Sequence, residues 1–149
     1  MYIEKKFKFY AAHRNIHLND KCSNLHGHRY GVVCRINVGD IKDDGITMVF
    51  DAIEKCIDPI IKEYDHSMLL DVNDPDRAAL QSLSTHDGRP NKCVLLPCPS
   101  SAENLAAILF KQVHDTGLQI EELHLQETDT SIVIYTLADH LKRNATEYN

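Results

Sequence analysis

Three histidines and a cysteine lie close together near the N-terminus, in an order that suits metal binding: His13, Cys22, His26 and His28. Successive side chains on a β-strand alternate between its two faces, so a spacing of two residues places His26 and His28 on the same face. On a helix the same two side chains would diverge by about 200°. The spacing therefore predicts a strand that carries two metal ligands.

The apolar pattern of the flanking residues extends this prediction to His13. Alternate residues before His13 are apolar and share its parity, and so do alternate residues from Tyr30 to Val38 with respect to His26 and His28. We expect all three imidazoles to project from the apolar face of a sheet, at one end of it. Each unsatisfied buried polar group costs about 1–3 kcal/mol, so three rings at one place favour a bound metal.

Zinc is the metal that three neutral imidazoles suit. Three protein ligands with an open fourth position form a catalytic site, whereas a fourth protein ligand makes the site structural. Cys22 leaves both alternatives open. It would close the site as a ligand, or it would act as a base or nucleophile, because a nearby dication lowers the pKa of a thiol.

Three carboxylates are further candidates. Asp65 precedes His66, and a carboxylate beside an imidazole orients the ring and favours its protonated form. Glu127 shares the parity of Leu123 and Leu125, at the end of an apolar strand face, where it would anchor a ligand with paired N–H donors or simply reach solvent. Glu103 has a structural interpretation as the last residue of a capping box that begins at Ser100.

Composition and charge exclude several classes of protein. The chain has 149 residues, a net charge of −6 and no run of lysine or arginine, which argues against nucleic acid as a main partner. No apolar stretch is long enough to span a bilayer, and the N-terminus lacks the apolar region of a signal peptide. Five cysteines without a paired framework fit a reducing compartment, so we expect a cytoplasmic protein.

The order of elements predicts one α+β domain over residues 1–149, with a four-stranded antiparallel sheet and two helices on one face (ββααββ). The expected strands cover residues 2–13, 29–40 (resuming at 46–50), 119–128 and 131–137. A helix is expected from an N-cap at Asp51 to Tyr64, with a kink or break at Pro59, and a second from the capping box to Gly117. Residues 71–99 are expected to form a loop with a short helix near 77–83. The tail from Asp139 onward is expected to be frayed.

Five short motifs, in order, resemble the 6-pyruvoyl-tetrahydropterin synthase superfamily, including its 6-carboxy-tetrahydropterin synthase branch of the queuosine pathway. They are Ala11-Ala12-His13, Lys21-Cys22-x-x-Leu25-His26-Gly27-His28, Asp65-His66, Ser101-Ala102-Glu103-Asn104 and Glu127-Thr128. The spacing between Cys22 and His26 favours the 6-carboxy branch. The resemblance implies the tunnelling fold, in which the sheets of several subunits join into a barrel with active sites at the subunit interfaces. It implies a homo-oligomer, with a hexamer favoured.

The resemblance also implies roles for individual residues. Zinc would be held by His13, His26 and His28. Cys22 would be the proton-abstracting base, Asp65 and His66 a second proton-transfer unit, and Glu127 the anchor of the pterin ring, with Glu103 and Thr128 as lesser contacts. The implied reaction converts 7,8-dihydroneopterin triphosphate into 6-carboxy-5,6,7,8-tetrahydropterin, and Arg14, Lys21 and Arg29 are candidate contacts of the triphosphate.

Two alternatives and two departures from the family pattern remain. The sister activity would form 6-pyruvoyl-tetrahydropterin from the same substrate, and a non-catalytic, zinc-stabilised oligomer is a rival of another class. The connection over residues 71–99 is longer than in compact members, which suggests a flap or altered oligomer contacts. Ser100-Ser101 replaces the Pro-Thr that commonly precedes Ala-Glu-Asn in the family, so the sequence does not identify which hydroxyl makes the contact there.

Overall fold

A curved sheet backed by helices forms the protein, seen in a computed structural model that describes residues 1–147. Six strands make the sheet, in the order β4-β3-β1-β2-β5-β6. The strands are β1 (Tyr2–His13), β2 (His26–Asn37), β3 (Ser67–Asp71), β4 (Cys93–Leu96), β5 (Ile120–Thr128) and β6 (Ser131–Thr136). The helices are α1 (Phe50–Tyr64), α2 (Arg77–Gln81), α3 (Ala102–Asp115) and α4 (Leu137–Glu147), with a 3-10 turn at Lys21–Ser23.

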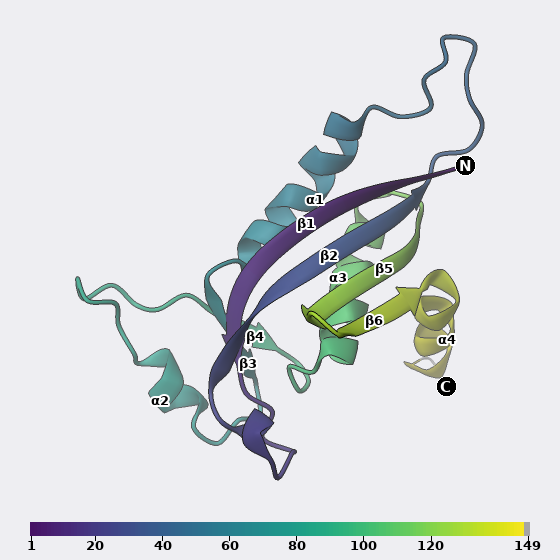
Figure 1. The fold of residues 1–149 in the computed structure, drawn as a ribbon. Helices are drawn as coiled ribbons and strands as arrows, with labels where there is room; N and C mark the ends of the chain where they lie inside the picture. The colour runs from purple at the N-terminus through teal and green to yellow at the C-terminus, as the bar shows by residue number, and fades with distance from the viewer. Residues whose placement is uncertain (148–149) are drawn as a thin grey trace.

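The two long helices cover one face of the sheet. Figure 1 shows α1 beside β1 and α3 behind the middle of the sheet. Both helices bury an apolar stripe against the inward residues of β1, β2 and β5, as the helical spacing predicts. The core forms from these contacts, with Phe9 stacked on Tyr30 at a ring-centroid distance of 4.9 Å and Ile57 and Phe110 fully buried. The α+β class and the helices on one face are confirmed.

Pairing between β1 and β2 brings the three histidines together. The two strands run antiparallel over their whole length, with His13 opposite His26 and Ala11 opposite His28. Directly opposed residues on antiparallel strands have Cβ atoms about 4.5–5.5 Å apart. The register therefore gathers the three imidazoles at the end of the sheet, as their parity predicts.

The sheet has two more strands than predicted. The four predicted strands form its antiparallel part, and β3 and β4 extend it in parallel beyond β1. All five residues of β3 are buried, so they lack the polar–apolar alternation by which a half-exposed strand is recognised. β4 has only four residues, within a segment expected to be loop. The short helix predicted near residues 77–83 is α2.

Several predicted boundaries were wrong. No strand resumes over residues 46–50, and α1 begins at Phe50 rather than after Asp51, with Val49 at its N-cap and no side-chain cap. Pro59 does not break α1, because Ile57 and Ile61 on either side of it are buried and hold both halves on the sheet. The tail is not frayed up to residue 147. It forms α4, which buries His140 against Phe110, with 5.3 Å between the ring centroids.

Among the described residues, none of the helices combines the length and the hydropathy needed to cross a bilayer.

Candidate functional site

The side chains of His13, His26 and His28 converge. Their ring centroids lie 4.6–5.1 Å apart, and one nitrogen from each ring lies within 4.8 Å of the others. His13 is buried, with 4 % of its surface exposed, whereas the other two are partly exposed. The arrangement is buried on one side and open on the other, as a metal site with room for a substrate requires.

Backbone carbonyls orient two of the rings. Nδ1 of His13 lies 2.8 Å from the Ser100 carbonyl oxygen, and Nδ1 of His26 lies 2.7 Å from that of Asn24. A carbonyl only accepts, so each Nδ1 carries the hydrogen and each Nε2 presents a lone pair. Nε2 of His13 is buried without a hydrogen-bond partner. A buried acceptor without a partner, in a ring held by its other nitrogen, is what a metal ligand needs, and the three imidazoles therefore fit zinc.

Burial favours the neutral form of His13 and of His28. Desolvation lowers the pKa of His13, which outweighs the hydrogen bond from its ring to Ser100 and the charge of Glu127. Desolvation also lowers the pKa of His28, against the opposing effect of Glu127. Neutral imidazole is the form that binds a metal, so burial prepares both rings for it.

A cavity of about 700 Å³ opens beside the three imidazoles. Its lining combines the predicted ligands with Cys22, Glu103, Glu127 and Thr128, from the 3-10 turn, α3 and the end of β5. These are all the predicted site residues except Asp65 and His66. The volume is in the range of small-molecule sites, so one cavity offers a metal site, a thiol and two carboxylates to one ligand.

The protein groups around Cys22 do not activate its thiol. Partial desolvation raises its pKa, and the carboxylate and hydrogen bond of Asp20 raise it further. The expectation of a lowered thiol pKa therefore rests on the metal ion alone, since a dication favours a nearby thiolate.

Glu127 lies at the end of β5 and turns towards the histidines. Its Oε1 is 3.6 Å from Nε2 of His13 and 4.0 Å from Nε2 of His28, both longer than a hydrogen bond. The hydroxyl of Tyr30 donates a long hydrogen bond of 3.5 Å to the same oxygen. Burial, and then this carboxylate, raise the pKa of Tyr30, so its hydroxyl stays protonated as a donor. Glu127 is thus held inside the cavity and does not simply reach solvent.

The capping-box interpretation of Glu103 was wrong. Ser101 caps α3 by accepting a hydrogen bond from the backbone N–H of Asn104, one residue later than predicted. Glu103 is consequently exposed and lines the cavity. Its carboxylate is available for a ligand.

Asp65 and His66 form an ion pair where α1 meets β3. Asp65 accepts from the backbone N–H of Tyr10 at 2.9 Å and pairs with Nδ1 of His66 at 2.8 Å. The N–H of Tyr10 and the His66 contact hold the pKa of the Asp65 carboxyl below its usual range. His66 adopts a left-handed backbone with φ of 54°, the only positive φ outside glycine over residues 1–147, and its side chain is 78 % exposed. Such backbone strain in a non-glycine residue is often found at functional sites.

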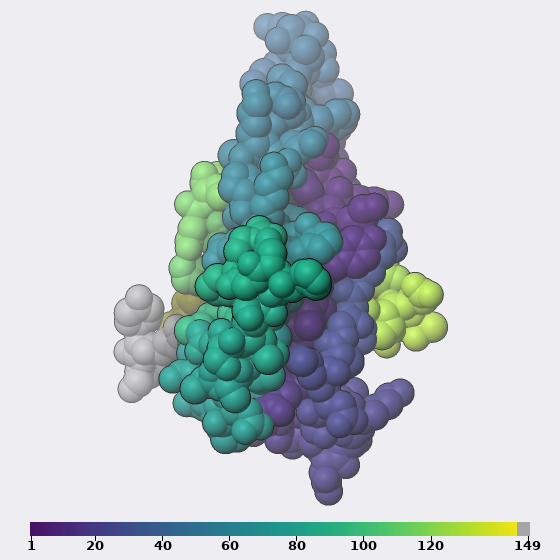
Figure 2. Space-filling view, turned by 90° about the vertical axis from the view of Figure 1, so that its left-hand side faces the viewer, coloured from purple at the N-terminus to yellow at the C-terminus, as the bar shows by residue number. Residues whose placement is uncertain are grey.

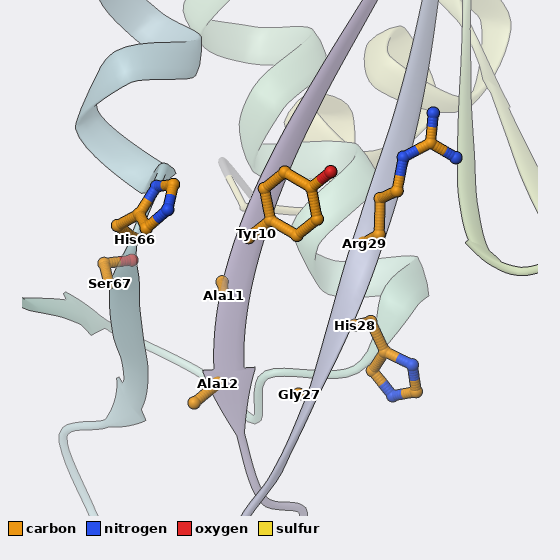
Figure 3. A pocket seen from close by; sticks show the side chains of 8 residues that line it. All are labelled: Tyr10, Ala11, Ala12, Gly27, His28, Arg29, His66 and Ser67. Atoms are coloured by element: carbon orange, nitrogen blue, oxygen red, sulfur yellow. The ribbon is translucent and has the colours of Figure 1, made fainter.

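This pair does not face the histidine cavity of its own chain. Figure 3 shows His66 on the same side of the sheet as Tyr10 and Arg29. The ring centroids of His66 and Tyr10 are 5.7 Å apart. Tyr10 and Arg29 are exposed and alternate with the buried residues of β1 and β2, so they lie on the sheet face away from the core. A separate hollow of about 420 Å³ lies here. One chain therefore does not bring Cys22 and His66 to one cavity.

The three candidate contacts of the triphosphate lie in different surroundings. Lys21 lines the histidine cavity. Arg29 lies on the outer face beside His66. Arg14 forms ion pairs with Asp74 and Asp76, at 2.5 and 2.8 Å, which leave it less available to a phosphate than Lys21 or Arg29. The aspartates come from the long connection, and pairing at such sequence separation has no sequence signal.

Sequence reasoning missed two residues of the site. Ser100 was taken as a helix cap, yet its carbonyl orients His13, and it is fully buried. Tyr30 was taken as core alone, yet its hydroxyl contacts Glu127. A tyrosine on the inward face next to the predicted ligands was the signal available, because a buried hydroxyl requires a partner.

The chain as a whole is similar to proteins of one family. The family model described as 6-pyruvoyl tetrahydropterin synthase matches residues 2–138. A protein from Aquifex aeolicus, named 6-carboxy-5,6,7,8-tetrahydropterin synthase, is 29% identical, covering 89% of this chain and 96% of its own. A Rickettsia conorii protein of the same name is 31% identical over 73% of this chain and 77% of its own.

A solved structure confirms the fold. The 6-pyruvoyl tetrahydropterin synthase of Plasmodium falciparum superposes with a TM-score of 0.64 at 20% identity, covering 90% of this chain and 96% of that one. The prediction of an enzyme of this type is confirmed by the match over nearly the whole chain. This chain belongs to the 6-pyruvoyl tetrahydropterin synthase family.

Proposed function

We propose that the protein converts 7,8-dihydroneopterin triphosphate and one water molecule into 6-carboxy-5,6,7,8-tetrahydropterin, acetaldehyde and triphosphate, in a zinc-dependent reaction. The observation that carries the proposal is the single cavity lined by three converging imidazoles, Cys22 and Glu127. Relatives named 6-carboxy-5,6,7,8-tetrahydropterin synthase support this product over the sister product.

The three imidazoles would hold zinc through Nε2 of His13 and His26 and one ring nitrogen of His28. Bound there, the ion supplies Lewis acidity towards the hydroxyls of the substrate side chain. Ser100 and Asn24 keep the two ligand lone pairs aimed at one point. This preorientation lowers the cost of ordering the ligands when the metal binds.

Cys22 would take the carbon-bound proton of the substrate side chain. A thiolate serves this role, and its position on the 3-10 turn places it on the wall of the cavity. Glu127 would anchor the pterin by accepting two N–H groups, from the 2-amino group and N3, because two parallel donors match one carboxylate. Glu103 and Thr128 would make further polar contacts, and Lys21 would meet the triphosphate.

The Asp65–His66 pair would complete the site of a neighbouring copy in a homo-oligomer, for which a hexamer is our favoured size. The pair is preoriented and exposed on the outer face of the sheet, where its own chain places no thiol or metal ligand except His28. A partner cavity docked against this face would receive an imidazole whose ring is fixed by Asp65. His66 would then exchange protons with the substrate hydroxyls or ring.

A single incubation tests the proposal. Zinc-loaded protein is incubated with 7,8-dihydroneopterin triphosphate under anaerobic conditions, and products are identified by mass spectrometry, with acetaldehyde measured by an alcohol dehydrogenase assay. We expect the 6-carboxy product with equimolar acetaldehyde, and neither with the Cys22→Ala control. The 6-pyruvoyl product without acetaldehyde would assign the sister activity, which the name of the Plasmodium falciparum structure makes the second candidate. Unconsumed substrate would refute both.

A further inference from the structure

A partly buried ion pair joins the long connection after β3 to the residue that follows β1. The Arg14 guanidinium donates two hydrogen bonds to Asp74, from Nε at 2.8 Å and from a terminal nitrogen at 2.5 Å. The Asp74 side chain is 2 % exposed and that of Arg14 19 %. The forked geometry gives a fixed orientation as well as attraction, because both donors lie in one rigid plane.

The carboxylate of Asp74 is itself held by the turn that it starts. Its Oδ1 accepts from the backbone N–H of Asp76 at 2.8 Å, and its own N–H donates to the carbonyl of Asp71 at the end of β3. Asp76 adds a second contact to Arg14 at 2.8 Å. The connection thus offers Arg14 a rigid acceptor, and not a mobile surface carboxylate. Figure 2 shows this connection packed beside the end of β1.

Arg14 directly follows the ligand His13, and Ser100 links the two. The Ser100 hydroxyl donates to the carbonyl of Arg14 at 3.1 Å, while the Ser100 carbonyl accepts from Nδ1 of His13 at 2.8 Å. Ser100 is fully buried, and it follows β4, which pairs with β3. Hydrogen bonds therefore connect His13 to Ser100, Ser100 to Arg14 and Arg14 to Asp74. The pairing of β3 with β4 joins the segments that carry Asp74 and Ser100.

We propose that Arg14 and Asp74 are positioning residues for the metal site, which fix the ring of His13 through Ser100. The inference rests on the proposed role of His13 as a zinc ligand. The first part of the 71–99 connection would then support the metal site, whereas its length alone suggests a flap. The connection braces the strand end from which His13 projects, so that its buried Nε2 stays aimed at the ion.

Zinc affinity tests the proposal directly. The zinc dissociation constant of the full-length protein is measured by competition with a chromophoric chelator, in the wild type and in Asp74→Asn, which keeps the shape of the side chain and removes its charge. We expect affinity to fall about tenfold, the lower end of the effect of outer-shell substitutions. In cobalt-substituted protein, the visible absorption bands should shift as well. Asp87→Asn is the matched control, since it breaks an exposed ion pair with Arg89 in the same connection, and it should leave both readouts unchanged.

Two further variants keep the test decisive. Arg14→Lys retains the charge but loses the fork, so it should weaken zinc binding even if Asp74→Asn does not fold. Ser100→Ala removes the hydroxyl that links Ser100 to Arg14 while keeping the carbonyl that orients His13, so it should weaken zinc binding to a similar extent. A folded Asp74→Asn or Arg14→Lys protein with wild-type zinc affinity and a lower melting temperature would show a purely structural role and overturn the proposal. A wild-type protein that binds no zinc would instead refute the proposed function.

Discussion

The two faces of the sheet carry chemical groups of opposite character at the same end. On the helix-covered face, His13 is buried and its Nε2 has no hydrogen-bond partner. On the outer face, Asp65 accepts a hydrogen bond from the backbone N–H of Tyr10 and contacts Nδ1 of His66, whose side chain is exposed. The helix-covered face thus presents a ligand atom that pairs with no protein group. The outer face presents an imidazole that Asp65 orients and that lies outside the histidine cavity.

This difference is what the proposed sharing of an active site between copies requires. A buried acceptor without a partner costs free energy, which an ion bound at Nε2 of His13 would recover. An exposed imidazole carries no such cost, and its left-handed backbone is held by the contacts with Tyr10 and Asp65. Substitutions on the two faces should therefore separate metal binding from proton transfer.

The largest effect should come from the cavity face. His28→Ala leaves two imidazoles, which are too few to hold zinc, so metal content and activity should be lost together. Zinc is measured by atomic spectroscopy after gel filtration, with His86→Ala as a control on an exposed histidine outside the cavity. Full zinc content in the variant would exclude His28 from the ligand set.

Cys22→Ala should separate the thiol from the metal. We expect bound zinc to remain and turnover to fall about 10²–10⁴-fold, the usual contribution of a general base. Cys56→Ala serves as the matched control, because Cys56 lies on α1, away from the cavity lining. Loss of zinc from Cys22→Ala would make the thiol a fourth ligand and the site closed.

His66→Ala should fail by a different route and be rescued in mixtures. The variant should keep zinc and lose turnover about 10²–10⁴-fold, as Cys22→Ala does. When the two inactive variants are unfolded, mixed equally and refolded, random assembly gives about a quarter of the sites both intact groups. Activity near that fraction supports sites shared between copies, whereas an inactive mixture places both groups in one chain's site.

A smaller effect should follow from removing the charge of Glu127. Glu127→Gln keeps the size of the side chain but replaces two acceptor oxygens by one, which costs about 1.5–3 kcal/mol for a charge-assisted contact, or roughly 10–100-fold in kcat/KM. Steady-state kinetics would show the loss mainly in KM if Glu127 anchors the pterin. An unchanged KM would remove it from substrate binding. Glu121→Gln, on the same strand but outside the cavity, is the control.

The smallest effect should be a shift in pH dependence. Burial lowers the pKa of His13 and His28 in the folded protein, so the unfolded chain binds more protons at pH values below 6.5. Their contribution to stability is fully present above pH 6.5 and is lost as the pH falls from there to the folded-state pKa values. Thermal unfolding of zinc-free protein between pH 5 and 8 measures this slope. His13→Gln should flatten it, and an unchanged slope would contradict the assignment.

Local patterns predicted most of the site. Strand alternation placed His13, His26 and His28 on one face without any knowledge of the partner strand, because side-chain direction has a period of two. The same rule identified Glu127 as a carboxylate on an apolar face. Helical spacing located α1 and α3. Such predictions succeed where one residue and its near neighbours contain all the information.

Contacts between distant segments were not predictable from these patterns. β3 and β4 are short strands. They join the sheet only because β3 pairs with β1 and β4 pairs with β3. The Arg14–Asp74 ion pair joins residues 60 positions apart, and the Ser100 carbonyl meets His13 from 87 positions away. Neither the ion pair nor the backbone acceptor has a local signature.

The sequence by itself determined which side chains share a face, and hence the chemistry available: three imidazoles, a thiol and carboxylates. Only the tertiary structure decided which of these groups meet. It put Cys22 and Glu127 in the histidine cavity and left His66 on the opposite face. The physical reason is that side-chain direction follows from local backbone geometry, whereas proximity follows from packing and strand pairing across the whole chain.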